Sequence, residues 1–150
     1  MIFIRLIAGR PAFVRGVLAV GAMMLCGTVP GWAASNFPFD HDLLLDAAPM
    51  RPVKRVPILN VAPDGNATID LWCRTVSGRV EVSDATIRIE PAPLPDALPD
   101  MMADGQCTPE RMQADQDLLA LISLMTGWQR NDDAVVLIGP KTLRFLISSH

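Results

Sequence analysis

The chain has 150 residues, half of them hydrophobic, and its 13 basic and 16 acidic side chains give a net charge of −3. Residues 1–33 contain three arginines and no acid, so the remainder carries 10 basic and 16 acidic residues, a formal charge of −6. This acidic balance argues against nucleic acid and against an anionic membrane surface as partners, because no basic stripe is present to release counterions.

The first 33 residues have the features of a signal peptide. Three arginines precede an apolar run, residues 17–25, that is too short to cross a bilayer comfortably as a permanent helix. Cleavage after Ala33 places small residues at both specificity positions, and cleavage after Ala34 is the second choice. We therefore predict a periplasmic protein with no stable membrane span after cleavage. An uncleaved N-terminal membrane anchor is the alternative.

The chain after the leader divides into an N-terminal extension, residues 34–52, and a domain, residues 53–150. Within the extension, residues 43–45 form either a short buried strand or one helical turn. Residues 53–61 are β-branched and apolar, but Pro57 has no N–H to donate, which predicts an edge strand or an interruption there. Pro63, Asp64 and Gly65 follow with turn chemistry and predict a hairpin.

Residues 66–73 alternate with the period of a half-buried strand. The residues expected on its inner face are Ala67, Ile69, Leu71 and Cys73. A second strand is predicted after Gly78, and a third over residues 86–90. Four prolines between residues 91 and 99 then predict a stiff extended connector that joins no ladder.

The second half begins with a helix, because Thr108 is a good N-cap and Pro109 suits the first helical position. Its expected apolar face consists of Ala114, Leu118, Leu121, Ile122 and Met125, and Gly127 is the expected C-cap. Strands over 134–138 and 142–147 follow, joined by residues 139–141. The predicted fold is therefore α+β: a small antiparallel β-sheet or partly open barrel, packed by one main α-helix, with a C-terminal β-hairpin.

Cys73 and Cys107 are the two cysteines that remain after cleavage of the leader. In an exported chain two such cysteines are expected to be oxidised to each other, and closing a loop of about 35 residues stabilises a fold by roughly 3 to 4 kcal/mol. The alternative is a catalytic or redox thiol. It has little support, because the sequence contains no Cys-x-x-Cys and no histidine flanks either cysteine.

Several segments together resemble the META/HslJ-like domain family. They are "IDLWCRTVSGRVEV", "ATIRIEP", "MMADGQCTPER", the helix "MQADQDLLALISLMTGW" and "DDAVVLIGPKTLRF". By position, Cys73 and Cys107 match the two cysteines of the family pattern, while Trp72 and Arg74 stand where the pattern has Gly and Asn. The resemblance implies a compact β domain with a helix, a bacterial envelope location, and a role in stress tolerance or secretion; it implies no reaction.

The sequence offers no arrangement typical of catalysis. His41 lies between two aspartates whose side chains do not naturally converge with it, so a solvated histidine is favoured over a metal ligand. The carboxylates at 115 and 117 diverge on a helix, and those at 132 and 133 suit a turn. We therefore expect no catalytic residue, no metal and no cofactor.

Trp72 and Arg74 are the candidate binding residues, because an aromatic side chain on a polar strand face can anchor a partner. The alternative for this residue is partial packing under the proline-rich connector or under the N-terminal segment. We predict an exported non-enzymatic interaction or stress-protective protein that binds an unknown envelope protein or small ligand. The alternatives are an inhibitor of an envelope-acting hydrolase, with residues 91–105 as the inserted element, and a hydrolase that uses His41.

Overall fold

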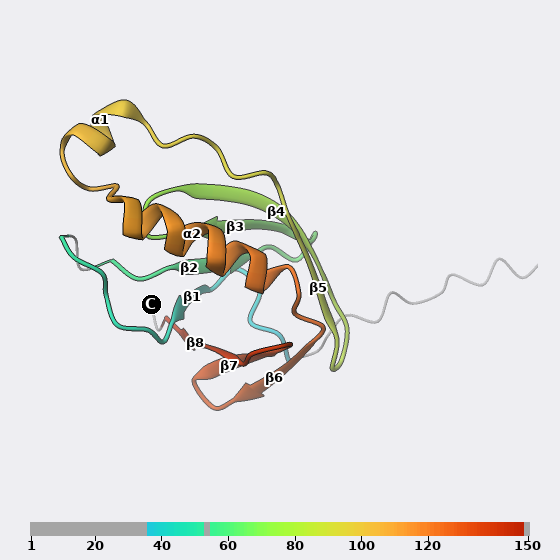
Figure 1. The fold of residues 1–150 in the computed structure, drawn as a ribbon. Helices are drawn as coiled ribbons and strands as arrows, with labels where there is room; N and C mark the ends of the chain where they lie inside the picture. The colour runs from blue at the N-terminus through green and yellow to red at the C-terminus, as the bar shows by residue number, and fades with distance from the viewer. Residues whose placement is uncertain (1–35, 53–54, 149–150) are drawn as a thin grey trace, which may run out of the picture. The chain divides into compact units, whose positions relative to one another are not determined.

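A computed structural model describes residues 36–52 and 55–148, and the predicted signal peptide lies outside these residues. The described chain forms a mainly antiparallel β structure with two helices (Figure 1). The strands are β1 (Asp42–Leu45), β2 (Ile58–Val61), β3 (Asn66–Asp70), β4 (Thr75–Val82), β5 (Ile87–Pro91), β6 (Gly127–Asn131), β7 (Ala134–Ile138) and β8 (Leu143–Ile147). The helices are α1 (Pro99–Ala103) and α2 (Pro109–Ile122).

The eight strands form a single sheet that closes almost completely into a barrel. Their order is β5-β4-β3-β2-β1-β8-β7-β6, and every neighbouring pair is antiparallel. The two outer strands then approach each other, where the Ile87 N–H donates to the Thr126 carbonyl (3.2 Å) and the Trp128 N–H donates to the Ala85 carbonyl (3.1 Å). Closure of this kind removes exposed strand edges.

The predicted main helix is present as α2, which lies against the inner side of the sheet in front of β2 and β3 (Figure 1). Its N-cap is Thr108, whose hydroxyl accepts a hydrogen bond from the Arg111 N–H at 3.3 Å. Leu118 and Ile122 bury themselves in the same core as Leu59 and Ile69 of the sheet. The helix therefore packs one side against the core of the sheet and leaves its other side exposed.

Residues of the predicted N-terminal extension take part in the sheet. Of the two possibilities for residues 43–45, the strand is observed: β1 pairs with β2 on one side and with β8 on the other. The Phe37 ring is buried and meets Trp128 edge to face, with 5.0 Å between the ring centroids. Of the two possibilities at Pro57, the interruption is observed: β2 begins directly after Pro57, and because β1 pairs with it, β2 is an internal strand and not an edge strand.

The C-terminal hairpin forms as predicted from β7 and β8, but two glycine assignments are wrong. Gly127 does not cap α2, which ends at Ile122; it begins β6 where β5 approaches, and an added Cβ would lie 3.4 Å from the Ala85 carbonyl oxygen. Gly78 lies inside β4 and does not precede it, since β4 starts at Thr75. Both glycines serve close approaches between strands that local sequence does not reveal.

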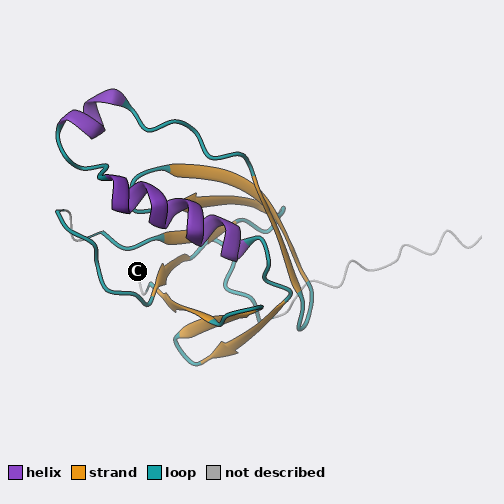
Figure 2. Cartoon of the chain, in the orientation of Figure 1, coloured by secondary structure: helices purple, strands orange, loops and turns teal. Residues whose placement is uncertain are grey.

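The connector between β5 and α2 differs from the expected extended segment. Residues 92–98 are irregular, but residues 99–103 form α1, a helix that contains no buried residue. Figure 2 shows α1 away from the sheet, whereas the loop before it begins in contact with the sheet: the Ala92 N–H donates to the Ser77 carbonyl of β4 at 2.8 Å, and Leu94 packs against the core. We call residues 92–106 the arm.

No helix within residues 36–52 and 55–148 has the length and apolar character needed to span a membrane.

The hairpin between β2 and β3 depends on Gly65. Its φ is +83°, and an added Cβ would lie 2.8 Å from the Val80 carbonyl oxygen. Next to it, the Asn66 N–H donates to the Asp64 carboxylate at 2.9 Å, which lowers the pKa of Asp64. The turn therefore combines a positive φ with a close backbone contact, and both require glycine.

We predict that Gly65→Ala lowers the free energy of unfolding, measured by urea denaturation, by at least about 2 kcal/mol. The alanine would suffer both the strain of a positive φ and a clash of its Cβ with the Val80 carbonyl oxygen. Gly105→Ala is the matched control: Gly105 also has a positive φ of 67° but no atom within 4 Å of an added Cβ. Gly105→Ala should lower the free energy of unfolding by about 1 kcal/mol, because only the strain of the positive φ applies there. Equal losses in the two variants would show that the contact with Val80 has no effect.

Candidate functional site

The turn between β3 and β4, residues 71–74, is held by one buried carboxylate. Asp115 on α2 is fully buried, and its two oxygens accept hydrogen bonds from three consecutive backbone N–H groups. These are the N–H groups of Trp72 (2.9 Å), Cys73 (3.2 Å) and Arg74 (3.1 Å). A carboxylate at this place satisfies donors that the turn itself leaves unpaired and that are shielded from water by the helix.

Arg74, one of the two predicted binding residues, is largely occupied in this network. Its Nε donates to Asp115 at 3.1 Å and its terminal nitrogen donates to the Met112 carbonyl at 2.8 Å. Only 10% of its side chain is exposed. The guanidinium supplies the positive charge that a buried carboxylate requires, so its contacts are with the protein itself.

Arg111 joins the same turn to the segment before α2. It is 2% exposed, and its guanidinium donates to the carbonyl oxygens of Trp72 and Gln106. The pKa of Arg111 is lowered from its usual value, mainly because the guanidinium is buried. The negative charge of Asp115 opposes this shift, and the positive charge of Arg55 adds to it. The group remains protonated at neutral pH because an arginine starts from so high a pKa.

The predicted disulfide between Cys73 and Cys107 is confirmed. The two Cα atoms are 5.3 Å apart, and both cysteines are buried. The bond connects the 71–74 turn to the residue that precedes the α2 N-cap. The turn is therefore held to the helix by a covalent bond, by the Asp115 carboxylate and by the Arg111 guanidinium.

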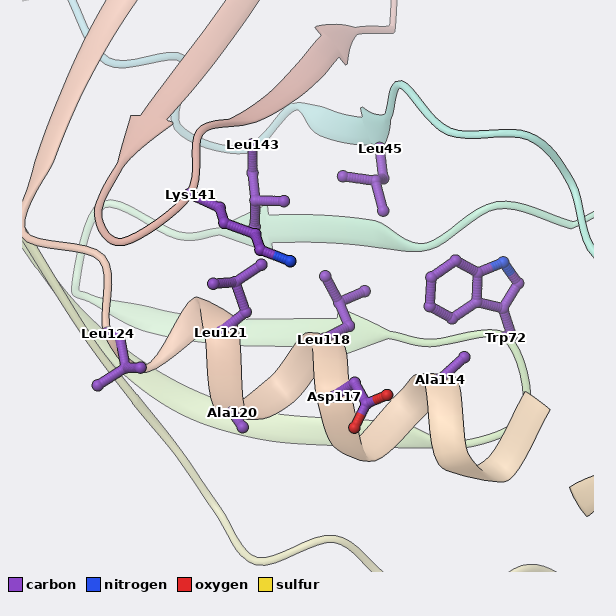
Figure 3. A pocket seen from close by; sticks show the side chains of 10 residues that line it. All are labelled: Leu45, Trp72, Ala114, Asp117, Leu118, Ala120, Leu121, Leu124, Lys141 and Leu143. Atoms are coloured by element: carbon purple, nitrogen blue, oxygen red, sulfur yellow. The ribbon is translucent and has the colours of Figure 1, made fainter. Parts of the chain in front are cut away.

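An apolar groove lies between α2 and the β1–β8 side of the sheet, and we call it the α2 groove (Figure 3). Its volume is about 550 Å³, within the range typical of ligand sites. The lining residues are Leu45, Trp72, Ala114, Asp117, Leu118, Ala120, Leu121, Leu124, Lys141 and Leu143. Leu124, at one end, is 55% exposed.

Trp72, the other predicted binding residue, lies at the opposite end of the α2 groove from Leu124 (Figure 3). It is partly buried and packs against the hydrophobic core. Its indole Nε1 is shielded from solvent and has no hydrogen-bond partner among the described residues. The expectation of a polar strand face is wrong for this residue, because β3 ends at Asp70 and Trp72 belongs to the turn.

Two charged residues border the α2 groove. Asp117 accepts a hydrogen bond from Gln113, one helical turn away, at 2.9 Å. Lys141 points from the β7–β8 turn into the groove, as Figure 3 shows. Within residues 36–52 and 55–148, Lys141 forms neither an ion pair nor a side-chain hydrogen bond.

The remaining sequence candidates occupy ordinary places. His41 is exposed, and its Nδ1 lies 2.8 Å from the Phe39 carbonyl oxygen, which agrees with a solvated, locally bonded histidine. Asp132 and Asp133 lie in the β6–β7 turn, as expected. Across the described part of the chain, no group of three or more His, Cys, Asp or Glu side chains is arranged to hold a metal ion.

The chain has no significant match to a protein-family model, to a curated protein or to a solved structure.

Sequence reasoning missed Asp115, Arg111 and Lys141. For the first two a signal was present: the buried residues of α2 are 111, 115, 118 and 122, a spacing of four, three and four that marks one helical face. Two charged residues in line with a buried apolar face indicate a buried polar network. Lys141 carried no such signal, because its position depends on how the β7–β8 turn meets the helix.

We predict that Asp115→Asn lowers the free energy of unfolding by about 3 to 5 kcal/mol, measured by urea denaturation. The side-chain amide of the asparagine would place its NH2 donor against backbone N–H groups of the turn. It would also leave Arg74 without its counter-charge. Asp117→Asn, on the exposed side of the same helix, should change the value by no more than about 0.5 kcal/mol. Similar losses in the two variants would contradict the role assigned to Asp115.

We predict that the exported, unreduced protein, once denatured, contains no free thiol from Cys73 or Cys107 when titrated with a thiol reagent. Replacing both by Ser should lower the free energy of unfolding by roughly 3 to 4 kcal/mol, because the open chain regains loop entropy on unfolding. Two free thiols in the exported protein would contradict the pairing.

Proposed function

We propose that this chain is an exported, non-enzymatic binding protein of the bacterial envelope, of the META/HslJ-like kind, and that the α2 groove is its binding surface. One observation carries the proposal: an apolar hollow of about 550 Å³, with Trp72 at one end and exposed Leu124 at the other. The lining is mostly apolar and grades from buried Leu45 and Leu118 to exposed Leu124, which is the kind of surface that ligand sites offer.

The use of the polar residues supports a binding role over a catalytic one. The buried charged groups, Asp115, Arg74 and Arg111, direct their hydrogen bonds at one another and at backbone atoms of the 71–74 turn, of α2 and of the arm. They hold structure, and a substrate would have to displace these contacts to reach them. The exported location follows from the leader and accords with the disulfide.

A second candidate function, inhibition of an envelope-acting hydrolase, is favoured by the arm. Leu98 is 64% exposed and Met102 is 50% exposed, and α1 buries none of its side chains. Exposed apolar side chains on a projecting segment suit insertion into a cleft of another protein. The arm and the α2 groove are separate surfaces, so one experiment can distinguish them.

The test is site-specific photo-crosslinking of the full chain expressed and exported in cells. We expect a crosslinker at Leu124 to give a defined adduct, protein or lipid, and one at Arg88 on β5 to give none. The adduct should disappear when Leu121→Asp is added, because a carboxylate in an apolar groove opposes burial of an apolar ligand. Circular dichroism and the thermal midpoint check that the variant is folded.

Absence of an adduct at Leu124, or an equal adduct at Arg88, would contradict the proposal. A crosslinker at Met102 tests the arm in the same cells. If Met102 captures a hydrolase, and the purified protein inhibits that enzyme, the inhibitor function replaces the proposed one.

A further inference from the structure

We infer that the α2 groove binds an aliphatic carboxylate, with its hydrocarbon chain along the leucines and its carboxylate at Lys141. This inference rests on the proposed function, and it names the chemical class of the ligand. It is carried by three features of the groove: the nature of its walls, the position of its one cation and its volume.

The walls favour a hydrocarbon chain over an extended peptide. Apart from Lys141 and Asp117, the lining side chains are aliphatic or aromatic. The strands that form one wall, β1 and β8, are each hydrogen-bonded to neighbours on both sides. They therefore offer no free edge to a peptide backbone, whose N–H and C=O groups would lose water without gaining partners. An alkyl chain has no such groups.

The charge favours an anionic head group. Lys141 is the groove's cation, and it has no ion-pair partner within residues 36–52 and 55–148. Asp117, the other charged residue of the lining, is exposed on α2 and hydrogen-bonded to the neutral Gln113 amide, so it does not neutralise Lys141 through an ion pair. An ammonium group beside apolar surface attracts a carboxylate and repels a cation. The leader of this chain has three arginines and no acid, so it does not complement Lys141.

The volume of the groove determines how the affinity depends on the length of the hydrocarbon chain. A hollow of about 550 Å³ leaves room for a chain of several methylenes. Burial of each methylene should raise the affinity about fourfold until the groove is filled. The series octanoate, decanoate and dodecanoate therefore measures how much chain the groove covers.

The experiment is isothermal titration calorimetry of the exported, purified protein with these carboxylates below their micellar concentrations. Decanol and decyltrimethylammonium are the matched probes, since they keep the chain and change the head from anionic to neutral or cationic. We expect decanoate to bind most tightly and decyltrimethylammonium most weakly.

The variants assign the contacts. Lys141→Gln should weaken decanoate about three- to fivefold, as loss of a largely exposed ion pair does, and leave decanol unchanged. Arg88→Gln is the control, because it removes the same charge from an exposed residue of β5. Leu124→Asp should weaken all neutral and anionic probes, and its exposed position makes loss of folding a small concern.

Equal binding of the three head groups, or no effect of Lys141→Gln, would overturn the carboxylate assignment. If those probes still lose affinity with Leu124→Asp, the groove itself remains the binding surface, so the proposed function survives. Failure of every probe to bind overturns the inference, and the Leu124 crosslink then decides the proposed function independently. A protein adduct at Leu124 that excess decanoate does not reduce would also overturn the inference that the groove binds an aliphatic carboxylate.

Discussion

The structure depends on one buried carboxylate. Asp115 faces three successive N–H groups of the 71–74 turn, and Arg74 returns to it from the same turn. A buried charge is costly unless hydrogen bonds and an opposite charge surround it, and here both are present. The arrangement ties the end of the β3–β4 hairpin to the middle of α2. Without it, the polar backbone of the turn would be buried beneath the helix with no partners.

This constraint also shapes the α2 groove. Trp72 belongs to the turn that Asp115 holds, while Leu118 and Leu121 belong to the helix that carries Asp115. The disulfide and Arg111 fix the same turn to the start of the helix. The end of the groove and its helical wall are therefore joined by these contacts. The other wall comes from β1 and β8, which makes the shape of the groove a property of the closed sheet.

Closure of the sheet relies on contacts between distant segments. β1 is only four residues long, yet it connects the β2–β5 meander to the C-terminal strands. β6 was missed because only Trp128 of its five residues is buried, so the strand has almost no apolar alternation. Its place is set by pairing with β7 and by the approach of residues 85–87. Such pairing requires neighbours that no local window contains.

The sequence by itself determined what short-range physics controls: the inward face of β3, the turn at Gly65, the start of α2 at Thr108 and the C-terminal hairpin. It also indicated the Cys73–Cys107 bond, through the chemistry expected of an exported chain. Only the tertiary structure decided which strands are neighbours, that Asp115 is buried, and that Lys141 meets the groove. Residue periodicity acts over a few positions, whereas strand order, polar burial and the shape of a groove arise between segments far apart in the chain.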